Sequence, residues 1–487
     1  MTAGVTSAYS RGNEGGPVQA PDFDVVVVGS GAAGLAAALA AAEEQASVLV
    51  VESEGIVGGS SRLSGGLMMG AGTRYQRALG IEDSPEALFH DYMTLNQWQV
   101  EDAVVERLTQ RAGAAVEWLG DHGVEFYDEM VYGGDETVPR VHCPIGRGQA
   151  VVETLYARCR EKGVEFALGQ RIDRLIVEDG AVRGVAVGDD EITAGGVVIA
   201  TGGFGASEDK RRELFPSVFD TEWSYYIGAD GSRGDALDFT KAVDAQVTGF
   251  NRGLRLLHTD FDRMYEAYIP GWLVLVNRDG RRFCNETAPY GIMDGLLAAQ
   301  GDVAFAIFDH RRLVEATELG VARYKQSIPG STKRQSPHWN LDIIEMMIKE
   351  GKVHVADSIE QLADLLGVPV ENLQATVDRV NAFHAAHEDA DYLKDPKFLE
   401  PIAEGSFYGV EVRPATCCFT ACGLRIDRDA HVLDSSGRPI RGLFAAGEVT
   451  GGVIGPRYVG SGNSYGNCVT MGRVAGQSAA HVTVAAS

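Results

Sequence analysis

The stretch DVVVVGSGAAGLAAALAAA, residues 24–42, decides the fold of this chain. Its four consecutive valines predict a strand buried on both faces, and its alanine-rich end predicts a helix. Gly29, Gly31 and Gly34 form a GxGxxG turn between them, which lets a pyrophosphate approach the N-terminus of the helix. GxGxxG alone is a weak signal, but the strand before it and the helix after it supply the context that the motif requires.

The segment that follows completes a βαβ unit. SVLVVES, residues 47–53, predicts a second parallel strand, which ends in Glu52. A carboxylate at the end of this strand can accept hydrogen bonds from ribose hydroxyls. We therefore predict an α/β protein with a Rossmann-type dinucleotide-binding domain.

Composition excludes several classes of protein. The 487 residues carry a formal net charge of −25, which repels phosphate backbones, so we expect no nucleic-acid partner. No apolar run reaches the roughly 18 residues that a membrane-spanning helix needs, and we expect no transmembrane segment. Residues 1–20 lack a signal-peptide pattern and predict a flexible tail. The seven cysteines have no metal-type or haem-type spacing, which predicts reduced thiols, no metal site and a cytoplasmic protein.

The amino-acid composition changes in the second half of the sequence. Glycine-rich loops occur up to about residue 255 and return after about 406, whereas aromatic residues, methionine and histidine become commoner between them. NLDIIEMMIKEG and SIEQLADLLG predict amphipathic helices in that middle part. We predict a dinucleotide-binding domain over 21–255, an inserted α+β substrate domain over 256–405, and completion of the first domain by 406–487.

The co-occurring motifs VGSGAAGLAAA, GGSSRLSGG, ATGGFG, NRDGRRFCNE and AAGEVTGG resemble those of the flavoprotein family of fumarate reductases, succinate dehydrogenases and 3-ketosteroid dehydrogenases. The resemblance covers nearly all of the chain after residue 20 and implies an FAD-binding domain with an inserted cap domain. By this resemblance the cofactor-binding residues are Gly29, Gly31, Ala33, Gly34, Glu52, Ser53, Gly59, Ser60, Ser61, Ser64, Gly65, Gly66, Thr201, Gly202, Gly203, Glu448, Ser464 and Tyr465. Respiratory members attach FAD through a histidine before the second glycine cluster. No histidine occurs between 58 and 66, so we expect non-covalent FAD.

The stretch FCNETAPYG, residues 283–291, bears on the reaction. Fumarate reductases place a proton-donating arginine where this chain has Tyr290, and they clamp a dicarboxylate with a histidine that is missing from ATCCFTACG. Ketosteroid dehydrogenases instead resemble this chain in carrying NE-x-x-PY, with the tyrosine as base. The resemblance therefore assigns proton transfer to Tyr290.

A second stretch, GPRYVGSGNSYGN at 455–467, resembles the ketone-binding segment of ketosteroid dehydrogenases. There a tyrosine hydroxyl and the backbone N–H of a glycine four residues later bind the ketone oxygen, and Tyr458 and Gly462 have that spacing. Two donors on a carbonyl stabilise a developing enolate. We predict an FAD-dependent oxidoreductase that introduces a C=C bond next to the ketone of a small hydrophobic ring, with an external electron acceptor. A 3-ketosteroid desaturated at the 4,5-bond is favoured over the 1,2-bond, from the resemblance of residues 63–88.

Two alternatives stay open. One is a reductase of an enone or an unsaturated acid, in which Arg457 clamps an anion. The other is a flavoprotein whose FAD is structural and whose surface binds a partner. Supporting phenols could come from Tyr127, Tyr132, Tyr225 or Tyr226, whereas we expect structural roles for His258, His310 and His338.

Overall fold

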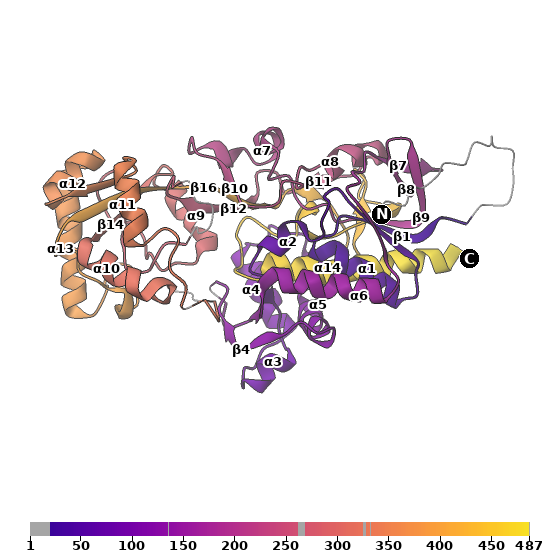
Figure 1. Ribbon diagram of the computed structural model, residues 1–487, viewed down its shortest axis with the longest axis horizontal. Coiled ribbons are helices and arrows are strands. Elements are labelled where there is room, and N and C mark those ends of the chain that lie inside the picture. Colours follow the sequence, from indigo (N-terminus) through magenta and orange to yellow (C-terminus); the bar gives the residue numbers. More distant parts are fainter. Residues whose placement is uncertain (1–19, 135, 262–267, 325–327, 332, 487) are drawn as a thin grey trace.

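The computed structural model describes residues 20–134, 136–261, 268–324, 328–331 and 333–486. The predicted N-terminal tail lies outside these residues except for Ala20. In Figure 1 the described chain forms an elongated molecule, with β1 and the end of α14 toward one end and the helices of the middle part of the chain at the other. No described helix is both long and apolar enough to span a membrane, and the described residues contain no cluster of three potential metal ligands.

One eight-stranded sheet organises the first domain. Its main path runs β18-β19-β9-β1-β2-β6, and β8 joins β7 to β9. The bounds are β1 Phe23–Val28, β2 Val48–Glu52, β6 Glu165–Leu168, β7 Arg174–Glu178, β8 Ala181–Val187, β9 Asp190–Ile199, β18 His431–Leu433 and β19 Pro439–Ala445. β1 pairs in parallel with both β2 and β9, and β19 pairs in parallel with β9. The predicted βαβ unit and α/β class are confirmed.

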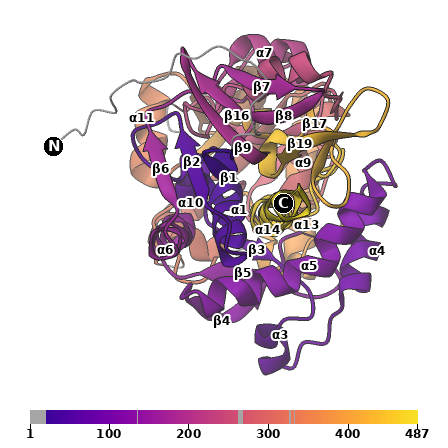
Figure 2. The same ribbon diagram turned by 90° about the vertical axis from the view of Figure 1, so that its right-hand side faces the viewer.

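Two helices from opposite ends of the chain pack against each other beside this sheet (Figure 2). They are α1, Ala32–Glu43, and α14, Asn463–Ala486. A Cβ on Gly472 would lie 2.4 Å from the oxygen of Ala33, and a Cβ on Gly476 would lie 2.1 Å from the oxygen of Ala37. The two glycines therefore allow the helix backbones to touch, which holds the C-terminal helix against the glycine loop.

A small lower layer completes this half of the molecule. It is the three-stranded sheet β3-β5-β4 together with the neighbouring helices. The bounds are α2 Gly59–Leu63, β3 Met68–Met69, α3 Arg74–Ala78, α4 Pro85–Leu95, α5 Asp102–Asp121, β4 Phe126–Val131, β5 Val141–Pro144 and α6 Arg147–Glu161. Met69 N–H donates to the oxygen of Gly462, at 3.0 Å, so this layer contacts the start of α14.

The second sheet is built around the long strand β16, Phe407–Thr420, which pairs with β10, β12, β14 and β15. The other elements of the middle and C-terminal parts are α7 Glu208–Leu214, β10 Tyr225–Tyr226, α8 Ala236–Phe239, β11 Val247–Thr248, β12 Gly253–His258, β13 Val274–Val276, α9 Tyr290–Ala298, β14 Ala304–Asp309, α10 His310–Leu319, α11 Leu341–Lys349, β15 Val353–Ala356, α12 Ile359–Leu366, α13 Val370–Ala386 and β17 Gly423–Leu424. The sheet thus contains strands that precede, fall within and follow the predicted insert 256–405. β16 links the cap to the FAD-binding half because the chain continues from it into β17. The predicted domain bounds are not tested by this arrangement and stay predictions.

Candidate active site

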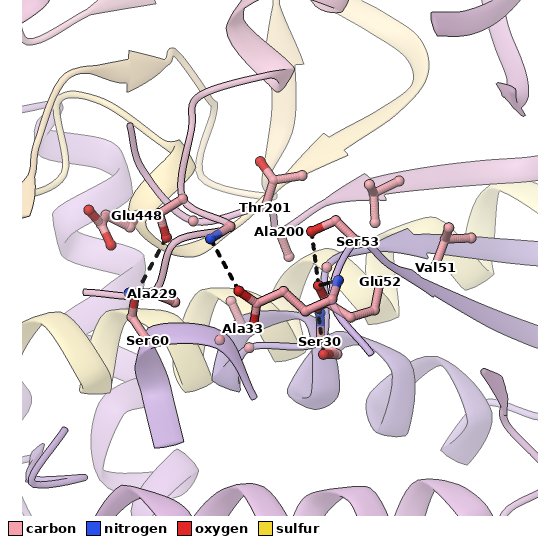
Figure 3. A pocket seen from close by; sticks show the side chains of 18 of the residues that line it. Ser30, Ala33, Val51, Glu52, Ser53, Ser60, Ala200, Thr201, Ala229 and Glu448 are labelled. Carbon is pink, nitrogen blue, oxygen red and sulfur yellow. Dashed lines mark hydrogen bonds between the residues drawn. The ribbon is translucent and has the colours of Figure 1, made fainter. Parts of the chain in front are cut away.

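A pocket of about 830 Å³ lies beyond the ends of β1, β2 and β9 (Figure 3). It is lined by the first glycine loop, the end of β2, the start of α2, the turn after β9 and Glu448. These segments are far apart in sequence. The carboxyl ends of neighbouring parallel strands bring them together, at the place where open α/β sheets bind ligands.

The glycines of the first loop have different tasks. Gly29 has φ 104°, and a Cβ there would lie 2.3 Å from the oxygen of Ala200. A Cβ on Gly34 would lie 1.9 Å from the oxygen of Gly29. These two glycines allow the tight strand-to-helix turn, whereas Gly31 lines the pocket together with Ala33.

Glu52 stands at the pocket wall in a fixed orientation. Its Oε2 accepts from the backbone N–H and the hydroxyl of Ser30, at 2.8 and 2.6 Å. Its Oε1 accepts from the Ser53 hydroxyl at 3.1 Å and from the Glu54 N–H at 2.8 Å. Both Glu52 and Ser53 line the pocket, so the structure places the predicted ribose acceptor where a dinucleotide can reach it.

The second glycine cluster divides into two parts. Gly59, Ser60 and Ser61 line the pocket, and the Ser61 hydroxyl accepts from the Ala32 N–H at 2.9 Å, which ties α2 to the N-terminus of α1. Ser64, Gly65 and Gly66 are not among the lining residues. A Cβ on Gly66 would lie 2.5 Å from the Gly148 nitrogen, so this end of the cluster packs against α6.

The turn after β9 offers an unsatisfied polar atom. Thr201 and Gly202 line the pocket, and Thr201 Oγ1 is buried without a hydrogen-bond partner among the described residues. Buried hydroxyls are normally satisfied, so this atom fits a ligand that supplies a partner. Gly203 packs instead against Glu448, since its Cβ would lie 2.2 Å from the Glu448 Oε1.

Glu448 is a half-buried carboxylate in the pocket wall. Its Oε1 accepts from the Thr420 N–H at 2.9 Å and from the Thr420 hydroxyl at 3.1 Å. Burial raises the pKa of Glu448 above its usual range, and the hydrogen bonds from Thr420 oppose the shift. Thr420 ends β16, so the long cap strand helps to place this carboxylate.

Sequence analysis missed one wall of the pocket, the segment GADGSRGD at 228–235. Ala229 N–H donates to the Ser60 hydroxyl at 2.9 Å, and Gly231 N–H donates to Glu54 Oε1 at 3.2 Å. The signal was the glycine spacing of this segment, which has the same style as the other ligand loops. Arg171 and Cys468 also line the pocket and had no recognisable motif.

The donors and acceptors of this pocket fit a dinucleotide. A helix N-terminus and exposed backbone near Gly31 suit a pyrophosphate, Glu52 suits a ribose, and Thr201 lacks a partner. Ser464 and Tyr465 lie at the start of α14 but are not lining residues. Ser464 N–H donates to the Tyr458 hydroxyl at 3.2 Å, and the Tyr465 hydroxyl donates to the oxygen of Gly148 at 3.4 Å. Their predicted contact with the cofactor stays a prediction.

A second centre is formed by tyrosines from the cap and from the loop before α14. Tyr290 is the first residue of α9, and its hydroxyl lies 3.0 Å from the Ser461 hydroxyl. Its ring centre lies 5.9 Å from that of Tyr458 and 5.2 Å from that of Tyr268. The structure thus brings together Tyr290 and Tyr458, as expected, and adds Ser461 and Tyr268, which no motif had indicated.

Burial controls the protonation of these phenols. The pKa of Tyr290 is raised well above 10, first by burial and then by Tyr458 and Tyr268, against a hydrogen bond from Ser461. Burial also raises the pKa of Tyr458, and the Ser464 N–H opposes that shift. Both hydroxyls therefore carry their protons at neutral pH and are available as donors.

The close contact between cap and loop depends on glycines. A Cβ on Gly291, in the first turn of α9, would lie 2.5 Å from the oxygen of Tyr458. Gly462 has φ 89°, and a Cβ there would lie 2.8 Å from the Met69 nitrogen. Gly462 is held between β3 and α14 in the same loop as Tyr458. Its predicted contact with a ketone stays a prediction.

Arg457 does not lie in the wall of the cavity beside Tyr290. Its side chain is exposed and its guanidinium lies over Gly295 of α9, 3.3 Å from where a Cβ would be. The cavity wall comprises Leu256, Leu257, Tyr268, Ile269, Glu286, Thr287, Ala288, Pro289, Tyr290, Met293 and Tyr324. The one charged residue in this list, Glu286, is paired with Arg282 and Lys394. The described wall therefore offers no free cation to a carboxylate.

The four candidate supporting phenols lie elsewhere. Tyr226 fills the space beside Gly205 and Gly228, the Tyr225 hydroxyl bonds to Asp260, and Tyr132 is exposed. The Tyr127 hydroxyl lies 2.3 Å from where a Cβ on Gly330 would be. Of the histidines, His258 stacks on Tyr225, His310 bonds to the Tyr408 hydroxyl and His338 packs on Phe261.

Comparison with known proteins identifies the class. Residues 24–465 match the family model described as FAD binding domain, so the chain belongs to that family of flavoproteins. The chain is 32% identical to fumarate reductase (cytochrome) of Shewanella frigidimarina over 474 residues, which cover 94% of this chain and 77% of the relative. It is 26% identical to 4-oxocyclohexanecarboxylate 2-dehydrogenase of Sinomonas cyclohexanicum, with 94% of this chain and 93% of the relative covered.

Among solved structures, 3-ketosteroid-Δ4-(5α)-dehydrogenase from Rhodococcus jostii RHA1 in complex with 4-androstene-3,17-dione matches with a TM-score of 0.77 and 27% identity. The match covers 95% of this chain and 98% of that one. The protein is therefore an FAD-dependent oxidoreductase that acts on CH–CH bonds. The relatives include both reductases and dehydrogenases, so they show this reaction class and not the 3-ketosteroid specificity that the sequence predicted.

Proposed function

We propose that the protein reduces the C=C bond of an α,β-unsaturated carbonyl compound, with Tyr290 as the proton donor. The observation that carries the proposal is the half-buried Tyr290, whose hydroxyl lies 3.0 Å from the Ser461 hydroxyl at the meeting of cap and FAD-binding domain. FAD bound in the pocket and reduced by an external electron donor would supply the hydride that this chemistry needs at the β-carbon. Tyr290 gives its proton to the α-carbon, and the Ser461 hydroxyl is placed to hydrogen-bond to the phenolate until solvent returns the proton.

The protonation state of Tyr290 favours reduction. Burial raises the pKa of Tyr290, which disfavours the tyrosinate that the reverse reaction needs as its base. The fumarate reductase relative supports the same direction. These points move the preference from the dehydrogenation predicted from sequence to the reductase alternative.

A neutral carbonyl compound suits the site better than a dicarboxylate. The described wall of the Tyr290 cavity has no unpaired cation, and the Arg457 side chain is exposed over Gly295. A carboxylate without a cation would be desolvated at a cost. Tyr458 can instead donate its hydroxyl proton to a ketone oxygen, because its oxygen accepts from the Ser464 N–H.

The second candidate is the reverse reaction, desaturation of a ring ketone such as a 3-ketosteroid with an external electron acceptor. The pairing of Tyr290 with Tyr458 supports it, since two phenols in contact can serve as base and as ketone donor. The relatives that act on 4-oxocyclohexanecarboxylate and that bind 4-androstene-3,17-dione support it as well. In either direction we propose that FAD is bound non-covalently, which predicts release of the flavin on acid precipitation.

An anaerobic flavin assay tests the direction. Enzyme with photoreduced flavin is mixed with cyclohex-2-enone, fumarate or 4-androstene-3,17-dione, and oxidised enzyme is mixed with a saturated 3-ketosteroid. Reoxidation by an enone, with little bleaching by the saturated ketone, supports reduction. Bleaching by the saturated ketone without reoxidation by either enone would refute the proposed reduction. Reoxidation by fumarate alone would indicate a dicarboxylate substrate instead of a neutral carbonyl compound.

The same assay tests the role of Tyr290. Tyr290→Phe should lose proton donation, which is typically worth about 10²–10⁴-fold in rate, while FAD stays bound. Tyr156→Phe is the matched control, because Tyr156 packs on Phe166 on the surface of α6. Normal turnover by Tyr290→Phe would remove this tyrosine from the mechanism.

A further inference from the structure

The backbone that carries Ser461 lies against a second loop, which contains Gly133, Gly134 and Glu136. Ser461 N–H donates to the oxygen of Gly133 at 2.9 Å, and Gly134 forms an antiparallel bridge with Gly460. A Cβ on Gly133 would lie 2.5 Å from the Ser461 oxygen. The two loops thus touch backbone to backbone, and the contact holds the backbone of Ser461 in place.

Glu136 shapes this second loop. Its Oε1 accepts from the Gly133 N–H at 2.9 Å and its Oε2 accepts from the Gly134 N–H at 2.7 Å. The residue is 7% exposed. Charge-assisted bonds of this kind are stronger than neutral ones, and their loss would leave two backbone N–H groups without acceptors. The carboxylate therefore holds the two glycines in the shape that receives Ser461.

We propose that Glu136 is a positioning residue that holds the Ser461 hydroxyl against Tyr290. Contacts of 2.9 Å from Glu136 to Gly133, 2.9 Å from Gly133 to Ser461 and 3.0 Å from Ser461 to Tyr290 form a continuous path. The role in turnover rests on the proton transfer proposed for Tyr290. A displacement of about 1 Å in a reacting pair can cost about 100-fold in rate, so a carboxylate remote from the substrate can control the reaction.

Hydrogen exchange tests the first half of this path without any substrate. In Glu136→Gln the N–H of either Gly133 or Gly134 faces an amide NH2 in place of an oxygen, so the loop loses one of its two hydrogen bonds. The Gly133 oxygen that accepts from the Ser461 N–H is then held less firmly. Amide exchange in peptides that span residues 457–463 should therefore be faster than in the wild type. Glu129→Gln is the matched control, because Glu129 is an exposed carboxylate on the preceding strand. Unchanged exchange in Glu136→Gln would overturn the proposal.

Turnover tests the second half. With cyclohex-2-enone as oxidant, Glu136→Gln should lower kcat by roughly 10- to 100-fold, with little change in KM or FAD content. In a Ser461→Ala background the same substitution should cost little more, because its effect passes through the missing hydroxyl. An equal loss in both backgrounds, or a loss confined to KM or to FAD content, would overturn the positioning role.

The two experiments separate the two proposals. Faster exchange together with full activity of Tyr290→Phe would refute the proton transfer proposed for Tyr290 and still support the hold of Glu136 on Ser461. Exchange in Glu136→Gln as slow as in the wild type, together with an inactive Tyr290→Phe, would refute the hold of Glu136 on Ser461 and still support the proton transfer proposed for Tyr290.

Discussion

Acidification should destabilise this protein through His142, a buried histidine in β5. Its Nδ1 lies 3.2 Å from the oxygen of Met68 and 3.0 Å from that of Arg140. Both partners only accept, so Nδ1 carries the proton. Nε2 lies 2.8 Å from the Thr73 hydroxyl and accepts from it, because the neutral ring has one bare nitrogen. A second ring proton would have no acceptor there.

The structure gives the size and the sign of the effect. Burial lowers the pKa of His142 from 6.5 to about 4, against hydrogen bonds to Met68 and Arg140. As the pH falls, the unfolded chain binds the proton first, so the stability contribution is present above pH 6.5 and is lost as the pH falls toward 4. A shift of this size corresponds to about 3 kcal/mol, at 1.36 kcal/mol for each pH unit.

The assay is urea unfolding of the FAD-bound protein at neutral pH and near pH 4.5, for wild type and for His142→Gln. Other groups titrate in both proteins, so the quantity to compare is the difference between their pH dependences. Wild type should lose about 2–3 kcal/mol more than the variant. His90→Gln is the control, because the His90 side chain is 75% exposed. Equal pH dependences of wild type and His142→Gln would refute the reasoning.

Two further predictions concern stability and cofactor retention. Glu286→Gln leaves Lys394 buried without its counter-ion, at 3.0 Å in the wild type, and should cost about 3–5 kcal/mol. Calorimetry should show a lower Tm than for Asp391→Asn, which breaks an exposed pair worth at most about 1 kcal/mol, and similar Tm values would contradict the prediction. Gly472→Ala places a Cβ 2.4 Å from the oxygen of Ala33, should cost about 1–3 kcal/mol and should weaken FAD retention on gel filtration. Full FAD retention together with wild-type stability in Gly472→Ala would contradict the prediction, because it would show that close contact between α1 and α14 is not required.

The cofactor half of this protein could be predicted because its signals are local. Residues 24–42 specify a strand, a turn and a helix in one continuous segment, and the structure forms β1 and α1 there. Gly34 is needed for a contact within this segment, because its Cβ would meet the oxygen of Gly29, whereas Gly29 is needed for a contact with Ala200 that only the folded sheet creates. Ser64 is not among the residues that line the pocket, and its predicted contact with the cofactor stays a prediction.

The reaction centre could be predicted only in part. A motif indicated Tyr290 and Tyr458. Ser461 lies in the same stretch, 455–467, but nothing in the sequence showed that its hydroxyl, and not another group of the stretch, would meet Tyr290. Tyr268 likewise meets Tyr290 through the packing of the cap.

The sequence by itself determined the class of fold, the place of the dinucleotide and two of the phenols, because strand period, glycine turns and a short motif are properties of neighbouring residues. Only the tertiary structure decided which groups meet Tyr290, that burial raises its pKa, and that Arg457 lies outside its cavity. The physical reason is that protonation and contact depend on the burial and the charges around a group. Those surroundings come from β16, α9 and α14, which meet only when the chain is folded.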